Sequence, residues 1–333
     1  MTVADYMAAC LHHPQFGYYA SRPRLGAEGD FITAPLVSQM FGELIGLWAA
    51  ETWMRMGAPA RFRLVEMGPG DGALMSDILR AGRAIPGFLD AADLWLVETS
   101  PPLREAQRAK LGDRQWASAL AGVPGGAPLI LVANELLDCL PARQFVRMVD
   151  GWAERRVGLS PDGGLTFGLA PPPNGFMPSD APPGSLLEWS EPTVVLGAEV
   201  GRRVASDGGA ALFIDYGRDE PGYGDTLQAL IAHEKVSPLD RPGEADLTVH
   251  ADFPTFAMAA RKAGAGATSI LEQGDFLRRL GMAERASALQ AARPDKAEGI
   301  GRQLARLVEP DQMGSLFKAV AIHAQGLSVP GFE

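Results

Sequence analysis

A glycine-rich turn between a predicted strand and a predicted helix is the strongest chemical signal in this sequence. It reads Glu66-Met67-Gly68-Pro69-Gly70-Asp71-Gly72 and starts within the last residues of a predicted strand, Phe62–Met67. Glycines let the backbone turn tightly and approach a ligand closely. Their spacing is G-x-G-x-G, whereas dinucleotide binders use G-x-G-x-x-G to seat a pyrophosphate on a helix N-terminus. S-adenosylmethionine carries no phosphate, and an acid before the turn suits its cationic amino-acid group. The residues predicted to bind this methyl donor are Glu66, Gly68, Pro69, Gly70 and Gly72.

Glu98 ends the next predicted strand, Leu94–Val97. A carboxylate at this position can accept hydrogen bonds from both hydroxyls of a ribose. Dehydrogenases place an acid in the same way, so Glu98 supports a ribose without choosing between cofactors. An ordinary strand–turn–helix with a surface acid is the simpler alternative for both features.

Asn134 and Glu135 follow the almost entirely apolar run Pro128–Ala133. In open α/β sheets ligands bind beyond the carboxyl ends of the strands, so this pair is expected to face the reactive methyl or the substrate. In the alternative interpretation Asn134 only caps a helix and Glu135 complements its dipole. Asp30 is expected in a lid over the donor, or as a loop carboxylate that caps the next segment.

The elements that must position these residues alternate between strand and helix patterns. Helical runs follow the strands at Ala73–Ala84 and Pro102–Leu111, and Ala210–Asp215 is a buried strand that ends in an acid. Further helices are expected at Val195–Ser206, Phe253–Ala263 and Gly274–Leu280, and a late strand at Phe317–Ile322. The alternation predicts an α/β fold with a Rossmann-like, doubly wound parallel sheet and helices on both faces.

The chain is expected to divide into three structural parts. Residues 1–57 form an N-terminal helical extension and lid, which includes a helix over Val37–Met56 with one buried face. Residues 58–143 and 191–333 form the core with additional helices. Residues 144–190 form an insertion, because Asp150-Gly151 signals a β-hairpin and two proline-rich stretches follow it. A domain linker is the alternative for this last part.

Composition limits the possible partners. The chain has 333 residues, 47% hydrophobic and 21% charged, as in ordinary globular proteins. Its net charge of -10 argues against nucleic acid as the main partner and suits a cationic substrate. Cys10 and Cys139 are expected as reduced thiols, and no metal site is predicted. Trp48 and Trp53 suggest either core or a homodimer contact, and core is the stronger interpretation.

The ends and apolar runs of the sequence set an expected location. The first residues carry no charged segment followed by an apolar stretch, and they do not resemble a transit peptide. No apolar run approaches the ~20 residues of a membrane-spanning helix. A cytoplasmic location without membrane insertion is therefore expected.

Ordered motifs over essentially the whole chain resemble those of the MidA-like family, formerly a domain of unknown function. They are His13-Pro14 with Gly17-Tyr18-Tyr19, Gly29 to Pro35, Glu66 to Gly72, Val97 to Pro101, Asn134 to Asp138 with Leu140-Pro141, Ile214 to Gly217, Asp246-Leu247-Thr248 with Asp252-Phe253, and Met313-Gly314 with Leu316 to Lys318. The family's mitochondrial members assist the assembly of respiratory complex I. Asp71, Leu36 and Cys139 depart from residues that are common in the family, and these departures could alter the substrate.

The resemblance implies a class I methyltransferase fold and methylation of arginine in a protein, with a complex I subunit as the substrate. Guanidinium is a poor nucleophile because it stays protonated, and carboxylates can pair with it and fix its plane. The candidates for this role are Glu135, Asp138 and Asp215, and Glu135 is the first choice. His250 is weighed as a proton acceptor against a structural role. Phe16, Tyr18, Tyr19 and Phe31 are weighed as a clamp against core packing.

Three rival functions stay open at this point. An NAD-dependent oxidoreductase would share the fold and the ribose acid, but the glycine spacing weakens it. A non-catalytic assembly chaperone could use a methyltransferase fold, since a fold does not dictate function. Methylation of a small molecule is the third, and the long insertion argues mildly for a macromolecular substrate instead.

Overall fold

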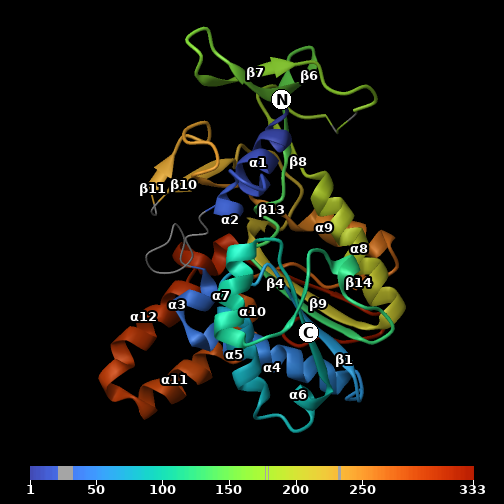
Figure 1. Cartoon of the computed structure of the whole chain (residues 1–333), viewed down its shortest axis with the longest axis vertical. Helices are drawn as coiled ribbons and strands as arrows, with labels where there is room; N and C mark the ends of the chain where they lie inside the picture. Colours follow the sequence, from blue (N-terminus) through green and yellow to red (C-terminus); the bar gives the residue numbers. More distant parts are fainter. Residues whose placement is uncertain (22–32, 177, 179, 232–233) are drawn as a thin grey trace.

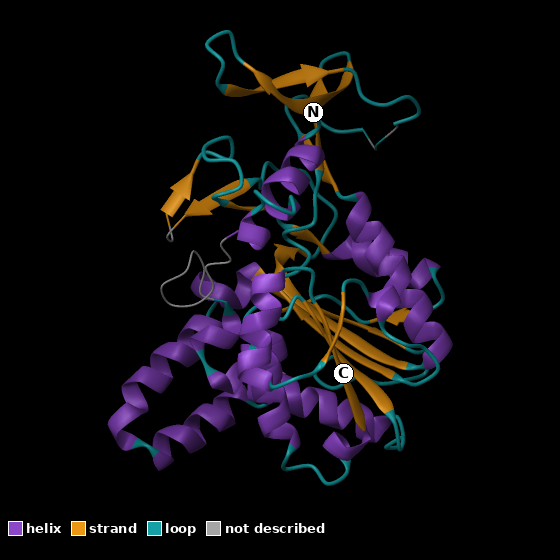
Figure 2. Cartoon of the chain, in the orientation of Figure 1, coloured by secondary structure: helices purple, strands orange, loops and turns teal. Residues whose placement is uncertain are grey.

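A central mixed sheet carries the architecture. The computed structural model describes residues 1–21, 33–176, 178, 180–231 and 234–333. The sheet has the strand order β14-β16-β9-β4-β1-β2-β3, and helices lie on both of its faces (Figure 2). The strands are β1 (Phe62–Met67), β2 (Ala92–Val97), β3 (Gln115–Ala117), β4 (Leu129–Asn134), β9 (Gly209–Arg218), β14 (Gly266–Ala267) and β16 (Phe317–His323), with the short β13 (Ala251–Asp252) on β9 and β15 (Leu271–Glu272) on β16.

Strand direction and order create a binding crevice. β1, β2, β3, β4 and β9 are parallel, and β16 runs antiparallel to β9. The chain proceeds from β1 to β2 and β3 on one side and then returns to β4 on the other, so the order reverses between β1 and β4. Ligands of doubly wound folds bind at such a reversal, beyond the carboxyl ends of the strands. The predicted doubly wound fold is confirmed, and the strands predicted at β1, β2, β4, β9 and β16 agree with the observed bounds to within three residues.

Two layers of helices bury the sheet. One contains α4 (Gln39–Arg55), α5 (Ala73–Gly82), α10 (Gln273–Arg279), α11 (Met282–Ala292) and α12 (Ala297–Val308). The other contains α8 (Glu191–Asp207) and α9 (Phe253–Lys262). The short helices are α2 (Tyr18–Ser21), α3 (Ala34–Val37) and α6 (Phe88–Ala91), and α7 (Pro101–Leu111) follows β2. In Figure 1 α11 and α12 form a hairpin that projects from the core.

Helix α4 belongs to the core layer, although the sequence division at residue 57 grouped it with the N-terminal extension. Trp48 and Trp53 of α4 are buried in the same cluster as Phe62 of β1. A Cβ added at Gly42 would lie 2.4 Å from the Cβ of Asp77, so this glycine lets α4 and α5 approach closely. The two tryptophans are therefore core residues and do not form a dimer contact.

A third apolar cluster joins segments that are distant in sequence. Helix α1 (Val3–His12) begins at a capping box of Thr2 and Asp5. It packs beside two antiparallel sheets, one of order β7-β6-β5-β8 and one of order β11-β10-β12 (Figure 1). Their strands are β5 (Arg143–Met148), β6 (Gly151–Leu159), β7 (Leu165–Ala170), β8 (Leu186–Trp189), β10 (Gln228–Ile231), β11 (Glu234–Val236) and β12 (Asp246–Thr248). The insertion is thus a four-stranded sheet, larger than the predicted hairpin and loop, and the second sheet was not predicted.

None of the described helices combines the length and the apolar character that a membrane span requires.

Candidate functional site

One cavity of about 660 Å³ lies where β1, β2 and β4 end. Its volume is within the range of small-molecule sites, and its place is the crevice that the strand order creates. It brings together most of the predicted site residues, namely Glu66, Gly68, Pro69, Gly70, Glu98, Asn134, Glu135 and Asp138. Among the described residues its lining contains seven carboxylates and no lysine or arginine. This imbalance favours cationic ligands.

The glycine turn adopts backbone conformations that other residues avoid. Gly68, Gly70 and Gly72 have φ of +65°, +54° and +82°, in the left-handed region. A Cβ at Gly68 would lie 3.0 Å from Leu136 Cδ1, so a side chain there would press on the neighbouring loop. Gly72 is the N-cap of α5 and does not line the cavity. Gly68, Pro69 and Gly70 line the cavity, so the turn presents its backbone there.

Glu66 is a buried carboxyl with one unsatisfied oxygen among the described residues. It is 2% exposed, and its Oε2 has no hydrogen-bond partner in the described part of the chain. Burial, with the nearby Asp71 and Glu98, raises the pKa of Glu66 to about 8. A buried carboxyl oxygen without a hydrogen bond is costly unless a ligand donates to it. The ammonium group of S-adenosylmethionine meets this need, so the donor set fits that cofactor.

Glu98 is tied to the glycine turn through Gln107 of α7. The N–H groups of Thr99 and Ser100 donate to Glu98 Oε1, each at 2.8 Å. Gln107 Nε2 donates to Glu98 Oε2 at 3.2 Å and to the Gly70 carbonyl at 2.8 Å. A carboxylate has lone pairs left for ribose hydroxyls after these bonds. Sequence reasoning missed Gln107, because a polar residue within a helix carries no signal of its own.

Glu135 stands at the point of greatest backbone strain in the cavity. Its φ is +54°, rare for a residue other than glycine and a feature of functional sites. Its Oε1 accepts hydrogen bonds from the Ala34 N–H at 3.2 Å and from Asn134 Nδ2 at 2.9 Å. Its Oε2 has no partner among the described residues. Burial, and then the charge of Asp138, raise the pKa of Glu135 to about 7.

Asp215 holds the backbone of the turn after β4 and does not line the cavity. Its Oδ2 accepts the N–H groups of residues 136, 137 and 138, at 3.0, 2.8 and 3.2 Å. Its Oδ1 accepts the Tyr216 N–H at 2.8 Å. Both oxygens are therefore occupied by backbone. Asp138, in contrast, lines the cavity, and burial raises its pKa to about 6. Of the two predicted aspartates, only Asp138 lies where it could contact a substrate.

The other predicted residues fall elsewhere. His250 is outside the cavity lining and meets the Tyr216 ring edge-on at 5.8 Å between centroids. Phe16 is 66% exposed and stacks on His13, whereas Tyr19 lines the cavity. Asp30 and Phe31 lie outside the described residues. Among the described residues no three metal-ligating side chains are grouped as a metal site.

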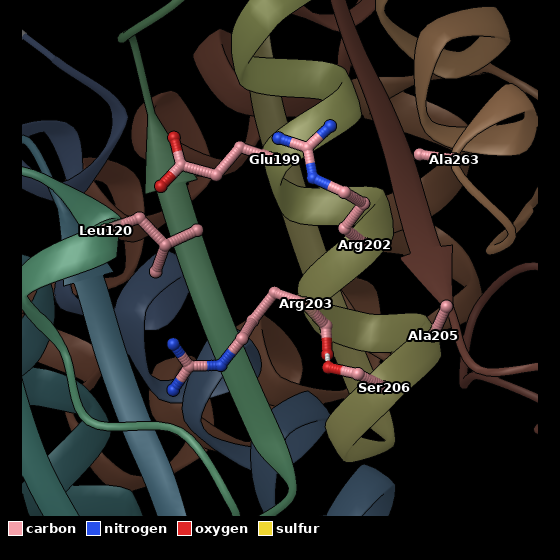
Figure 3. Close-up of a pocket in the computed structure, with 7 residues that line it drawn as sticks. All are labelled: Leu120, Glu199, Arg202, Arg203, Ala205, Ser206 and Ala263. Atoms are coloured by element: carbon pink, nitrogen blue, oxygen red, sulfur yellow. Dashed lines mark hydrogen bonds between the residues drawn. The ribbon is translucent and has the colours of Figure 1, made fainter.

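A second hollow, of about 590 Å³, lies along α8 (Figure 3). Leu120 and Glu199 line both hollows, so this groove begins beside the main cavity. Arg203 is held by the Val123 carbonyl at 2.8 Å and by Asp207. The groove has neither a glycine turn nor a group of carboxylates, so we assign the chemistry to the main cavity.

The fold and this cavity define a class I methyltransferase that uses S-adenosylmethionine. The chain belongs to the MidA-like family, described as "Putative S-adenosyl-L-methionine-dependent methyltransferase", whose profile matches residues 44–270. It is similar to a crystal structure from Burkholderia thailandensis of a protein described as a "likely methyl transferase", bound to S-adenosyl-homocysteine. That likeness has a TM-score of 0.85 and 25% identity, and covers 99% of this chain and 89% of the other.

Relatives with assigned functions also match the full chain. The rat protein named "Protein arginine methyltransferase NDUFAF7, mitochondrial" is 34% identical, covering 100% of this chain and 87% of the relative. The Drosophila melanogaster homologue of that name is 35% identical, covering 96% of this chain and 80% of the relative. Membership of this family removes the NAD-dependent oxidoreductase from the alternatives, and it confirms the resemblance inferred from the motifs.

Proposed function

We propose that this chain transfers a methyl group from S-adenosylmethionine to an arginine side chain of a protein substrate, a subunit of respiratory complex I. The observation that carries the proposal is Glu135, a strained, half-buried carboxyl at the end of β4, one oxygen of which has no hydrogen-bond partner among the described residues. It lies in the same cavity as the glycine turn. The names of the rat and fly relatives support arginine as the acceptor.

Arginine methylation sets requirements that the cavity residues suit. S-adenosylmethionine supplies a methyl group on a positively charged sulfur. The protein has to align the attacking nitrogen with that methyl and exclude water. Guanidinium must lose one proton as its nitrogen is methylated, and Glu135 Oε2 is proposed to accept it. A carboxyl with a pKa of about 7 is well matched to accept a proton near neutral pH.

Labelled methyl transfer tests this function. An extract of cells that lack the protein is incubated with methyl-labelled S-adenosylmethionine and purified wild-type protein, and labelled proteins are hydrolysed to amino acids. Label in methylarginine of a complex I subunit is the expected result. Glu135→Gln is expected to lose roughly a hundredfold or more of the rate while S-adenosylhomocysteine binding stays within about twofold. Label in lysine or in small molecules only would overturn the arginine assignment.

A chaperone role without catalysis predicts a different outcome. Gly70→Val would fill the donor turn, so a catalytic role predicts loss of complex I assembly in cells that carry only this variant. Full assembly with Gly70→Val, in a variant shown by calorimetry not to bind S-adenosylhomocysteine, would favour the chaperone.

Location and self-association complete the proposal. We propose a cytoplasmic location, supported by two buried cysteines that are both unpaired, as in a reducing compartment. Cell fractionation with an antibody to the protein tests it. We also propose that the protein can form a homodimer, and light scattering coupled to gel filtration tests that part. Any such dimer must use a surface other than Trp48 and Trp53, because both are core residues.

A further inference from the structure

Part of the cavity wall comes from segments outside the core sheet. His12 ends α1, Tyr19 belongs to α2, and Asp246 begins β12 of the small second sheet. These elements are joined by the third apolar cluster, which is separate from the two clusters that bury the core sheet. The core sheet provides the turn for the methyl donor. The wall formed by α1, α2 and β12 is therefore available to a second ligand, the methyl acceptor.

We infer that Tyr19, Asp246 and Asp138 form an acceptor subsite that holds the guanidinium group of the substrate arginine. This inference rests on the proposed function and deepens it by naming the residues that select the acceptor. None of Tyr19, Asp246 and Asp138 is needed to form the glycine turn or to engage Glu98. Their role is to bind and orient the side chain that receives the methyl group.

The geometry of these three side chains suits a flat cation. The Tyr19 hydroxyl donates a long hydrogen bond of 3.4 Å to Asp246 Oδ1, so the two side chains lie next to each other. The Tyr19 ring stacks on His12 with 5.6 Å between centroids and 20° between planes. Asp246 is 7% exposed and Asp138 is 6% exposed, so water cannot screen them well. Guanidinium can pair with carboxylates in two directions and stack on an aromatic face, whereas ammonium is a point charge.

Unsatisfied acceptor atoms give independent evidence of a donor-rich ligand. Asn134 Oδ1 is buried and has no hydrogen-bond partner in the described part of the chain. Glu135 Oε2 is likewise without one, and both residues line the cavity beside Asp138. Guanidinium carries five N–H donors and no acceptor. The described lining of the cavity contains carboxylates and no lysine or arginine, which favours a cationic acceptor.

Peptide binding to the protein saturated with S-adenosylhomocysteine tests the subsite. The probes are a blocked tripeptide with a central arginine and the same tripeptide with lysine, and dissociation constants are measured by NMR titration. The wild type is expected to bind the arginine peptide at least about tenfold more tightly than the lysine peptide. Asp246→Asn is expected to weaken arginine binding about tenfold or more, since it removes a charged hydrogen-bond partner. Tyr19→Phe is expected to weaken binding of the arginine peptide about threefold. Asp246→Glu keeps the charge, so it is expected to bind the arginine peptide more tightly than Asp246→Asn does.

The control is Asp240→Asn, which removes a charge from an exposed site between β11 and β12 and outside the cavity. It is expected to leave peptide binding unchanged. Unchanged affinity in both Asp246→Asn and Tyr19→Phe, or equal wild-type affinity for the two peptides, would overturn the subsite. If Asp246→Asn misfolds and so loses S-adenosylhomocysteine binding, the affinity of the conservative variant Tyr19→Phe for the arginine peptide decides whether the subsite exists. A wild type that labels methylarginine in the extract while the variants bind normally would keep the proposed function and reject the subsite.

Discussion

Glu135 has three properties that separate it from the other carboxylates of the cavity. It is strained, it is oriented by a backbone N–H and by Asn134, and one of its oxygens has no hydrogen-bond partner in the described part of the chain. Asp215 has the reverse pattern, because every hydrogen bond it makes is to backbone. Two acids at neighbouring strand ends therefore have different roles, one toward the substrate and one toward the turn that carries Glu135.

The pH dependence of turnover is a direct test of Glu135. The carboxylate form is the one that pairs with guanidinium and accepts a proton, and burial raises its pKa to about 7. We expect kcat/KM to rise with pH through about 7 and then level off, rather than to be constant above about pH 5. Rates measured from about pH 5.5 to 8.5 at saturating donor check this. A flat profile over that range would contradict the assignment.

The buried carboxyl of Glu66 should make the folding stability depend on pH. A carboxyl whose pKa is raised by folding stabilises the folded state fully below its unfolded pKa, and this contribution is lost as pH rises to the folded pKa. For Glu66 the window runs from 4.5 to about 8. We expect the ligand-free wild type to lose on the order of 3 kcal/mol relative to Glu66→Gln between these limits.

Urea unfolding at both ends of that window measures the difference. The matched control is Glu220→Gln, at an exposed position, which should follow the wild type. Parallel curves for wild type and Glu66→Gln would show that burial does not disfavour the charged form of Glu66.

The glycine turn is the element on which donor binding depends. Gly68→Ala adds a Cβ 3.0 Å from Leu136 at a φ of +65°, whereas Gly57→Ala adds one at a φ of +85° with nothing within 4 Å. Both should cost roughly 1 kcal/mol of stability through strain. Only Gly68→Ala should also weaken S-adenosylhomocysteine binding, by about tenfold or more. Calorimetric titration of both variants separates the two effects, and equal affinities would remove the turn from the donor site.

Elements also differ in how well the sequence predicts them. β1, β4 and β9 are buried along most of their length and are rich in apolar residues, so their composition and their alternation with helical segments located them. β10 to β12 are three or four residues each and include polar runs such as Glu234-Lys235, which give no alternation to detect. The glycine turn and the acids at the strand ends were predicted from their local sequence alone, and most of these residues line the cavity. Tyr19 and Asp246 meet only through tertiary packing, and the sequence cannot show which strand-end acid faces a ligand and which one binds backbone.

The whole molecule brings three separately packed clusters to one cavity. The core sheet and its two helix layers hold the donor turn, and the cluster of α1 with the two small sheets closes the acceptor side. A ligand in the cavity would therefore contact both the core sheet and the cluster of α1 with the two small sheets. Binding should stabilise the molecule as a unit, because only the folded chain assembles these walls.

Thermal unfolding with ligand measures this linkage. At about 100 times its dissociation constant, a ligand that binds only the folded state stabilises it by about 2.7 kcal/mol. For a chain of this size that corresponds to an increase in Tm of roughly 5 °C. S-adenosylhomocysteine should give this shift and NAD should give none, since the turn lacks the spacing that seats a pyrophosphate. Glu66→Gln should reduce the shift, because its neutral amide attracts the ligand ammonium less. A shift with NAD but not with S-adenosylhomocysteine would mean that the cavity binds a different adenosine ligand from the one its acidic lining favours.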